Sequence, residues 1–183
     1  MVVAVIDIGK TNAKVALVDL ARLRETAMRK TPNVVRTDGP YPHFDEAHLW
    51  EFILDSLRDL GREAPIESIS ITTHGATAAL LDAEGNLALP ILDYEFTGLE
   101  ALTDDYDTVR PPFAETGTPR LPGGLNLGAQ LFWQQRTHPA DFARATSILM
   151  YPQYWGFRLT GVRANEATSL GCHTDLWSPH RRT

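Results

Sequence analysis

The sequence predicts an α/β fold, and three patterns in its N-terminal half support that prediction. An apolar, β-branched run from Val2 to Ile6 indicates a strand buried on both faces, and Ala13 to Leu20 resumes the strand pattern after a polar, glycine-containing turn. These two runs predict a hairpin. From Asp45 the apolar residues recur at helical spacing, and from Ile66 to Thr73 they alternate as in a strand. Strands and helices in this order are typical of an α/β sheet.

The elements that join these patterns are predicted in chain order. A third strand is expected between Thr26 and Val35. The helix that starts at Asp45 is expected to stop at Gly61, because glycine commonly ends helices. A strand from Ala78 to Asp82 is expected to run into a turn at residues 84–86.

The C-terminal half combines short elements with a region that contains several prolines and glycines. That region, residues 104–124, is predicted to be a long loop within one domain. Three tryptophans, Trp133, Trp155 and Trp177, are interpreted as packing residues. The other expected elements are helices at Leu127–Gln135 and Tyr154–Leu159, the second ended by Gly161, a short helix after Pro139, and a strand at Ile148–Met150.

Length and composition describe one globular domain and exclude several classes of function. The 183 residues carry 17 basic and 23 acidic side chains, a net charge of −6. At roughly 150 residues per domain, this length predicts one unit or slightly more. The acidic balance argues against nucleic acid or an anionic membrane as a partner, and neither a signal peptide nor a membrane span is predicted. The single cysteine, Cys172, is expected to be a core thiol in a cytoplasmic protein.

The candidate functional residues gather in the first turn. A carboxylate at the end of a buried strand, followed by glycine, a cation, a hydroxyl and an amide, is what a polyphosphate and its Mg²⁺ require. Asp7 is the candidate ligand of the metal or of its waters, Gly9 lets backbone N–H groups approach phosphate oxygens, and Thr11 and Asn12 add donors. An ordinary hairpin turn also accounts for these residues, so both interpretations stay open.

The same turn differs by one residue from a phosphate-binding P-loop, because Ala4 stands where the first glycine of that motif belongs. A P-loop continues into a helix after its lysine, whereas the pattern that follows Lys10 is that of a strand. A P-loop enzyme is therefore disfavoured. Lys10 keeps two interpretations, a phosphate contact or a solvated lysine of the turn.

Two further sets of polar residues follow predicted strands. Thr73 and His74 close the strand that starts at Ile66, and ligands bind at the strand ends of open α/β sheets. Asp93 and Glu95 follow another apolar run and are candidate ligands of hydroxyl groups. A satisfied polar histidine and a solvated loop are the structural alternatives for these two sets.

With these residues in place, the chain resembles the N-terminal domain of the FGGY family of carbohydrate kinases. The family's fold is actin-like, or ribonuclease H-like, with a mixed sheet flanked by helices. The resemblance spans nearly the whole chain, because its segments occur in the family's order and approximate spacing. They are the phosphate motif at Val5–Lys14, the strand, His-Gly element and turn at Ile69–Asn86, the segment Leu89–Asp93, the region Gly117–Trp133, and the elements Leu159–Gly161 and Ala167–Gly171.

The resemblance implies ATP- and Mg²⁺-dependent phosphorylation of a sugar hydroxyl, in a ketose such as a pentulose or a 6-deoxyhexulose. The partners it implies are that sugar and ATP, with a homodimer as an option. By position, Asp7 would act on Mg²⁺, Gly9, Lys10, Thr11, Asn12 and Lys14 would bind phosphate, and Thr73 and His74, with Asp93 and Glu95 as further candidates, would bind the sugar.

The resemblance also implies that residues 1–183 are an incomplete N-terminal domain. The family's catalytic base lies further along than Thr183, so no catalytic residue is nominated, and Asp175 falls well before that base. The C-terminal nucleotide-binding domain is likewise expected to be absent from this chain. A non-catalytic sugar- or nucleotide-binding module of the same superfamily is the alternative function.

Three departures from the family pattern bear on the substrate. Lys10 stands where the family usually has a small or hydroxyl residue, and residues 151–154 replace a commonly charged stretch. The spacing from His74 to Asp82 is similar to that of L-fuculose and L-rhamnulose kinases rather than the shorter xylulose-kinase pattern. Thr77 stands near the place where those kinases carry an aspartate, so the sequence does not assign the sugar.

Overall fold

The computed structural model describes residues 1–183, which divide into two compact units. The first unit comprises residues 1–36 and 44–74, and the second comprises residues 37–43 and 75–183. Two short strands, β4 (Val35–Arg36) and β5 (His43–Phe44), lie where the chain passes from one unit to the other. None of the helices is both long and apolar enough to cross a bilayer.

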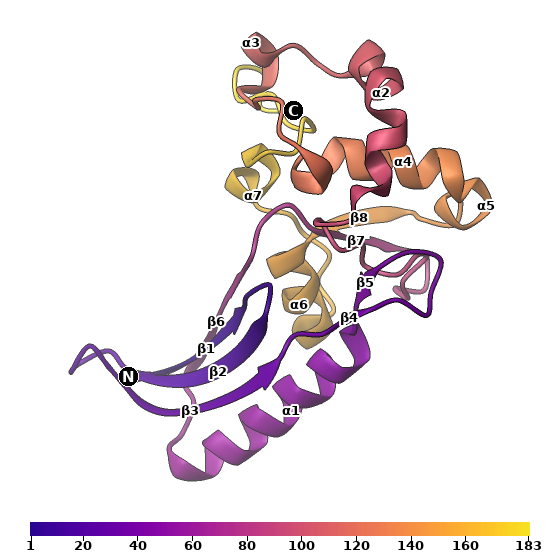
Figure 1. The fold of residues 1–183 in the computed structure, drawn as a ribbon. Coiled ribbons are helices and arrows are strands. Elements are labelled where there is room, and N and C mark those ends of the chain that lie inside the picture. The colour runs from indigo at the N-terminus through magenta and orange to yellow at the C-terminus, as the bar shows by residue number, and fades with distance from the viewer. The chain divides into compact units, whose positions relative to one another are not determined.

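The first unit is built on a four-stranded mixed sheet with the strand order β3-β2-β1-β6 (Figure 1). The pairs β1-β2 and β2-β3 are antiparallel, whereas β1 and β6 are parallel. The predicted hairpin and third strand are confirmed, and the parallel pair brings the carboxyl ends of β1 and β6 to the same edge of the sheet. The four strands span Val2–Ile8 (β1), Asn12–Asp19 (β2), Arg24–Pro32 (β3) and Ser68–Thr73 (β6).

Helix α1 (Glu46–Glu63) packs against β2 and β3 in the first unit (Figure 1). Its N-terminus is capped by Asp45, whose carboxylate accepts a hydrogen bond from the backbone N–H of His48 at 3.1 Å. The buried face keeps the helical spacing from which the helix is predicted, but Ser56 is buried in place of the expected Leu57, which is half-buried. The buried residues are Leu49, Ile53, Ser56 and Leu60.

The predicted end of this helix at Gly61 is wrong, because α1 continues to Glu63. The helix closes where the backbone N–H of Ala64 donates to the carbonyl of Leu60 at 3.2 Å. A glycine inside a helix costs only about 1 kcal/mol relative to alanine. Burial of an apolar side chain such as Leu60 stabilises the helix by about 1.5 to 3 kcal/mol, which outweighs that cost.

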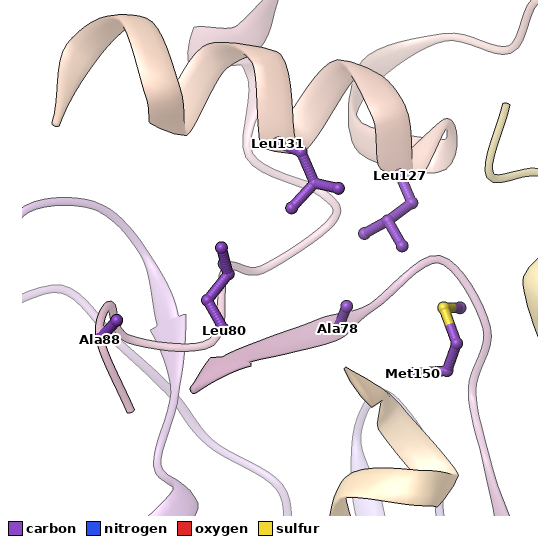
Figure 2. Close-up of a cluster of buried hydrophobic side chains, with 6 residues drawn as sticks. All are labelled: Ala78, Leu80, Ala88, Leu127, Leu131 and Met150. Carbon is purple, nitrogen blue, oxygen red and sulfur yellow. The ribbon is translucent and has the colours of Figure 1, made fainter. Parts of the chain in front are cut away.

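The two strands predicted in the second unit are confirmed as β7 (Ala78–Leu81) and β8 (Ser147–Met150), and the structure shows that they pair antiparallel. Helix α4 (Leu127–Thr137) contributes apolar side chains to the same core. Figure 2 shows the side chains of Leu127 and Leu131 pointing from this helix toward β7. The cluster consists of Ala78, Leu80, Ala88, Leu127, Leu131 and Met150.

Residues 104–124 are not the single long loop that their composition predicts. Two short helices, α2 (Thr103–Val109) and α3 (Phe113–Thr116), lie largely within this region. Pro112 stands directly before α3, where proline's missing N–H is tolerated, and Gly117 ends that helix at a φ of +68°. The prolines and glycines here therefore mark the ends of short helices.

Two of the remaining helices, one after Pro139 and one ended by Gly161, are predicted, whereas two 3-10 helices and a last short helix are not. Helix α6 (Tyr151–Thr160) begins earlier than predicted, because Pro152 fits the first turn of a helix. It is followed by Gly161 at a φ of +75°, which ends the helix as predicted. Trp133 and Trp155 are buried as predicted, but Cys172 is exposed and is not a core thiol, since it follows a short helix without buried residues. The bounds are Thr97–Leu102 and Gly123–Leu125 for two 3-10 helices, Pro139–Phe142 (α5), Tyr151–Thr160 (α6) and Ala167–Gly171 (α7).

Candidate functional site

The turn between β1 and β2 gathers most of the candidate phosphate ligands at one end of the first unit's sheet. The N–H of Gly9 donates to the carbonyl of Asn12 at 2.9 Å, and the strand register sets Asp7 opposite Lys14. A Cβ on residue 9 would lie 3.3 Å from the Asn12 carbonyl oxygen, so glycine permits the close approach of the backbone here. The side-chain amide of Asn12 donates to the Thr11 hydroxyl at 2.9 Å.

Asp7 and Lys14 form an ion pair at this turn. The ammonium nitrogen of Lys14 lies 3.0 Å from a carboxylate oxygen of Asp7, and the two side chains are 43% and 39% exposed. The hydrogen bond with Asp7 and then its negative charge raise the pKa of Lys14, so this side chain is cationic at neutral pH. Because an ion pair this exposed adds little to folding stability, the fold gives no reason to keep it. The pair leaves both the carboxylate and the ammonium partly exposed, and their binding of a metal and phosphate stays a prediction.

Asn33, which sequence reasoning does not single out, fastens the same turn from the end of β3. Its side-chain amide donates to the Gly9 carbonyl at 2.8 Å, and its backbone N–H donates to the Thr11 carbonyl at 3.0 Å. The side chain is buried, with 6% of the residue exposed. An asparagine after a strand usually reads as an ordinary turn residue, so the local sequence carries no signal of this contact.

The end of β6 lies beside the end of β1. Ile8 pairs with Thr73 in the parallel register, and the N–H of His74 donates to the Ile8 carbonyl at 2.8 Å. The Thr73 hydroxyl donates to the carbonyl of His74, also at 2.8 Å. The structure therefore brings Thr73 and His74, the candidate sugar ligands of the first unit, next to the strand that carries Asp7.

Lys10 is followed by β2 and not by a helix, which confirms that the turn is not a P-loop. The ammonium nitrogen of Lys10 lies 5.2 Å from the centroid of the Phe44 ring. At this distance a cation is attracted to the face of an aromatic ring. The interpretation of Lys10 as a solvated turn lysine is therefore incomplete, because its ammonium group contacts the ring of Phe44.

Asp93 and Glu95 belong to the second unit. Asp93 is buried, its backbone N–H donates to the Pro42 carbonyl at 3.0 Å, and one of its carboxylate oxygens accepts from the N–H of Glu95 at 3.2 Å. The carbonyl of Asp93 also accepts from the N–H of Phe96 at 2.9 Å. These bonds give Asp93 a local turn-forming role, and its binding of a sugar stays a prediction.

The described residues contain no group of three or more His, Cys, Asp or Glu side chains that is arranged to hold a metal. Mg²⁺ does not need such a cluster, because it usually keeps several waters and is bound by one or two carboxylates together with substrate phosphates. Asp7 fits this requirement, since its carboxylate is partly exposed beside the turn that carries the candidate phosphate donors.

Asp175 is used by the fold of the second unit. The guanidinium of Arg110 donates to both of its carboxylate oxygens, each at 3.0 Å, and the Tyr106 hydroxyl donates to it at 2.9 Å. Burial and then the hydrogen bond to Asp175 raise the pKa of Tyr106, so this hydroxyl stays protonated and keeps donating. The side chain of Asp175 is only 1% exposed, and these contacts give it a structural role.

A mixed sheet with a glycine turn at the end of its first strand and a histidine at the end of the neighbouring parallel strand is the arrangement expected of the carbohydrate-kinase domain that the sequence resembles. The chain belongs to the FGGY family of carbohydrate kinases, because the model of the family's N-terminal domain matches residues 2–175. L-fuculokinase of Escherichia coli K12 is 25% identical over 93% of this chain and 37% of that protein. Rhamnulokinase of Halalkalibacterium halodurans is 28% identical over 88% of this chain and 33% of that protein.

Solved structures agree with the family assignment. A carbohydrate kinase from Novosphingobium aromaticivorans superposes with a TM-score of 0.88 and 41% identity, covering 97% of this chain and 38% of that one. A ligand-bound xylulose kinase from Lactobacillus acidophilus gives a TM-score of 0.84 at 17% identity, over 100% of this chain and 38% of that one, and shows the fold alone. The expected actin-like α/β fold is thus confirmed. This chain spans 33% to 39% of the length of the curated relatives it matches.

Proposed function

We propose that this chain forms the sugar-side and first-phosphate part of a kinase that transfers a phosphoryl group from ATP to a hydroxyl of a ketose. The observation that carries the proposal is the parallel pairing of β1 with β6. Because these strands are parallel, the turn that follows Asp7 lies beside the strand end that carries Thr73 and His74. The hydrogen bond from the His74 N–H to the Ile8 carbonyl joins the two ends. Phosphoryl transfer requires a phosphate-binding element and an acceptor-binding element held side by side in this way.

The proposed roles follow from the chemistry of each group. The backbone N–H groups of residues 10–12, with the side chains of Lys10, Thr11, Asn12 and Lys14, bind phosphate oxygens. Gly9, whose own N–H is bonded to the Asn12 carbonyl, lets the backbone of the turn approach closely. Asp7 holds Mg²⁺ directly or through water, and the ion, when bound, neutralises negative charge on the phosphates. Thr73 and His74 of the first unit orient the sugar. For Asp93 and Glu95 of the second unit, binding of a sugar hydroxyl stays a separate prediction.

The carboxylate that accepts the proton of the sugar hydroxyl is not assigned to any residue of this chain. We propose that it and the nucleotide-binding domain belong to further polypeptide, which agrees with the 33% to 39% coverage of the relatives. Residues 1–183 alone are therefore expected to bind ligands without turnover. The acidic composition and the unpaired thiol of Cys172 favour a cytoplasmic site of action.

The substrate class comes from the relatives, whose names include L-fuculokinase, rhamnulokinase and probable L-xylulose kinase. Pentuloses and 6-deoxyhexuloses are accordingly the sugars to screen, in an assay that couples ADP release to a colour change, with protein of the relatives' full length. The alternative, a sugar- or nucleotide-binding module, predicts binding of one of these ligands and no ADP release.

The substitution Asp7→Asn keeps the shape of the side chain and removes its charge. In the longer protein, ADP release is expected to fall by more than about 100-fold, because a lost metal ligand removes several kcal/mol of charge stabilisation. In the 183-residue chain, the shifts that MgATP induces in the backbone amide signals of residues 9–12 are expected to weaken.

Asp59→Asn is the matched control, because Asp59 is also paired with a cation of the first unit and its side chain is 48% exposed. It is expected to leave both readouts unchanged. Full activity of the Asp7→Asn protein would remove Asp7 from the metal site, and loss of activity in both variants would indicate a general effect of charge.

A further inference from the structure

One buried aromatic ring contacts both the phosphate side and the sugar side of the candidate site. The ring of Phe44 lies 4.9 Å from the ring of His74, centroid to centroid, at an interplanar angle of 40°. The ammonium nitrogen of Lys10 lies 5.2 Å from the centroid of the same Phe44 ring. Phe44 is only 2% exposed, so the ring is enclosed between its neighbours.

The backbone around this ring is fixed on three sides. Phe44 directly precedes Asp45, which caps α1 through the N–H of His48. The N–H of His74 is bonded to the Ile8 carbonyl at the end of β1, and Lys10 follows two residues later in the turn. A phenylalanine has only two side-chain torsions, so a buried ring on a fixed backbone has little freedom to move.

We propose that Phe44 is a positioning residue of the site, which holds the Lys10 ammonium on the phosphate side and the His74 imidazole on the sugar side in one mutual arrangement. This inference rests on the proposed function, since it deepens the roles of Lys10 and His74. It also accounts for a lysine at position 10, where the family usually has a small or hydroxyl residue: the ring supplies the surface on which the longer side chain rests.

The attachment leaves Lys10 able to bind phosphate. An ammonium group has three N–H donors that point in different directions, and an aromatic face on one side leaves donors for anionic oxygens on the other. Because a lysine side chain loses rotamer freedom when it binds, holding it in advance lowers the entropy that binding costs. A cation–π contact at an exposed site corresponds to about a two- to five-fold change in affinity.

The test uses inorganic tripolyphosphate as the probe and the 183-residue chain, with NMR signals of the Lys10 side-chain methylene, the His74 ring and the amides of residues 9–12 as readouts. In the unsubstituted chain, all three sets are expected to shift along one binding curve. Phe44→Leu, which removes the aromatic face, is expected to weaken binding by about two- to five-fold and to abolish the response of His74. Phe44→Tyr, which keeps the face, is expected to retain both.

Two further variants keep the test decisive. Phe52→Leu on α1 is the matched control and is expected to behave as the unsubstituted chain does, because Phe52 lies on the helix and outside these contacts. Lys10→Met leaves Phe44 in place and tests the positioning role if Phe44→Leu does not fold. It is expected to lose the response of His74 while the amides of residues 9–12 still shift.

The outcomes separate this inference from the proposed function. A response of His74 that survives Phe44→Leu or Lys10→Met overturns the positioning role alone. Equal losses in Phe44→Tyr and Phe44→Leu also overturn it, because the aromatic face is then not the cause. Absence of any tripolyphosphate shift in residues 9–12 of the unsubstituted chain overturns the proposed phosphate site, and the positioning role with it.

Discussion

Asn33 shows how a single buried amide determines the shape of the candidate phosphate turn. It donates to the Gly9 carbonyl through its side chain and to the Thr11 carbonyl through its backbone. The side-chain oxygen is buried and has no hydrogen-bond partner among the protein groups. Asn33 therefore holds the turn through its two N–H donors, although its own side-chain oxygen is buried without a partner.

Asn33→Ala removes the donor and leaves the Gly9 carbonyl without this partner. The free energy of unfolding is expected to fall by about 1 to 3 kcal/mol, measured by urea denaturation, and the amides of residues 9–12 should exchange faster with solvent. Val34→Ala is the control, because Val34 is the next residue and is 53% exposed. A stability loss in Asn33→Ala without faster exchange in the turn would separate Asn33 from the turn's geometry.

The residues of the site that are predictable from the sequence are those whose contacts are local. Asp7 and Lys14 face each other because a short hairpin turn fixes the strand register, and the sequence of the turn reveals that hairpin. Asn33 and Phe44 reach the same turn through long-range packing, for which the local sequence has no pattern. Their chemistry, an amide and an apolar ring, is common enough that neither stands out before the fold is known.

Helix α1 illustrates what sequence patterns predict at the scale of an element. Its apolar spacing predicts its existence and its buried face, because both follow from 3.6 residues per turn. Its end is not predictable from Gly61 alone, since packing against the sheet outweighs the propensity of one residue. For the same reason residues 104–124 read as a loop, although buried contacts such as that of Tyr106 order them as helices.

The N-terminal cap of α1 is the feature of this element most open to test. Asp45→Ala removes the acceptor of the His48 N–H and is expected to lower the free energy of unfolding by about 1 kcal/mol. Urea denaturation followed by circular dichroism measures the change. Asp55→Ala, in the middle of the same helix at 76% side-chain exposure, is the control and should stay within about 0.5 kcal/mol. Equal effects of the two substitutions would contradict a capping role.

At the scale of the whole molecule, the order of motifs predicts more than any one of them. The Asp7 turn, the His-Gly element and the Leu-Thr-Gly element are each compatible with an ordinary turn or strand end. Their succession along the chain predicts the family, and the match over residues 2–175 confirms it. The division of the chain into two compact units is not predictable in this way, because residues 37–43 join the second unit from within the first unit's span.

A buried ion pair in the second unit connects Arg110 with Asp175, which are far apart in the sequence. Asp175 and Arg110 are 1% and 13% exposed at their side chains, and Arg110 also donates to the Thr118 carbonyl at 2.8 Å. Asp175→Ala leaves the guanidinium buried without a counter-charge, so the free energy of unfolding is expected to fall by about 3 to 5 kcal/mol. Chemical denaturation measures this loss.

The double variant Asp175→Ala with Arg110→Met distinguishes the attraction within the ion pair from the cost of burying an unpaired charge. Because replacing both members of a buried ion pair by apolar groups is often close to neutral, the double variant should be more stable than Asp175→Ala alone. Asp141→Ala, which breaks an exposed pair with Arg144 in the same unit, should cost no more than about 1 kcal/mol. A double variant less stable than the single one would mean that Arg110 stabilises the unit mainly through its bond to Thr118 and its packing. The ion pair would then not be what stabilises the unit.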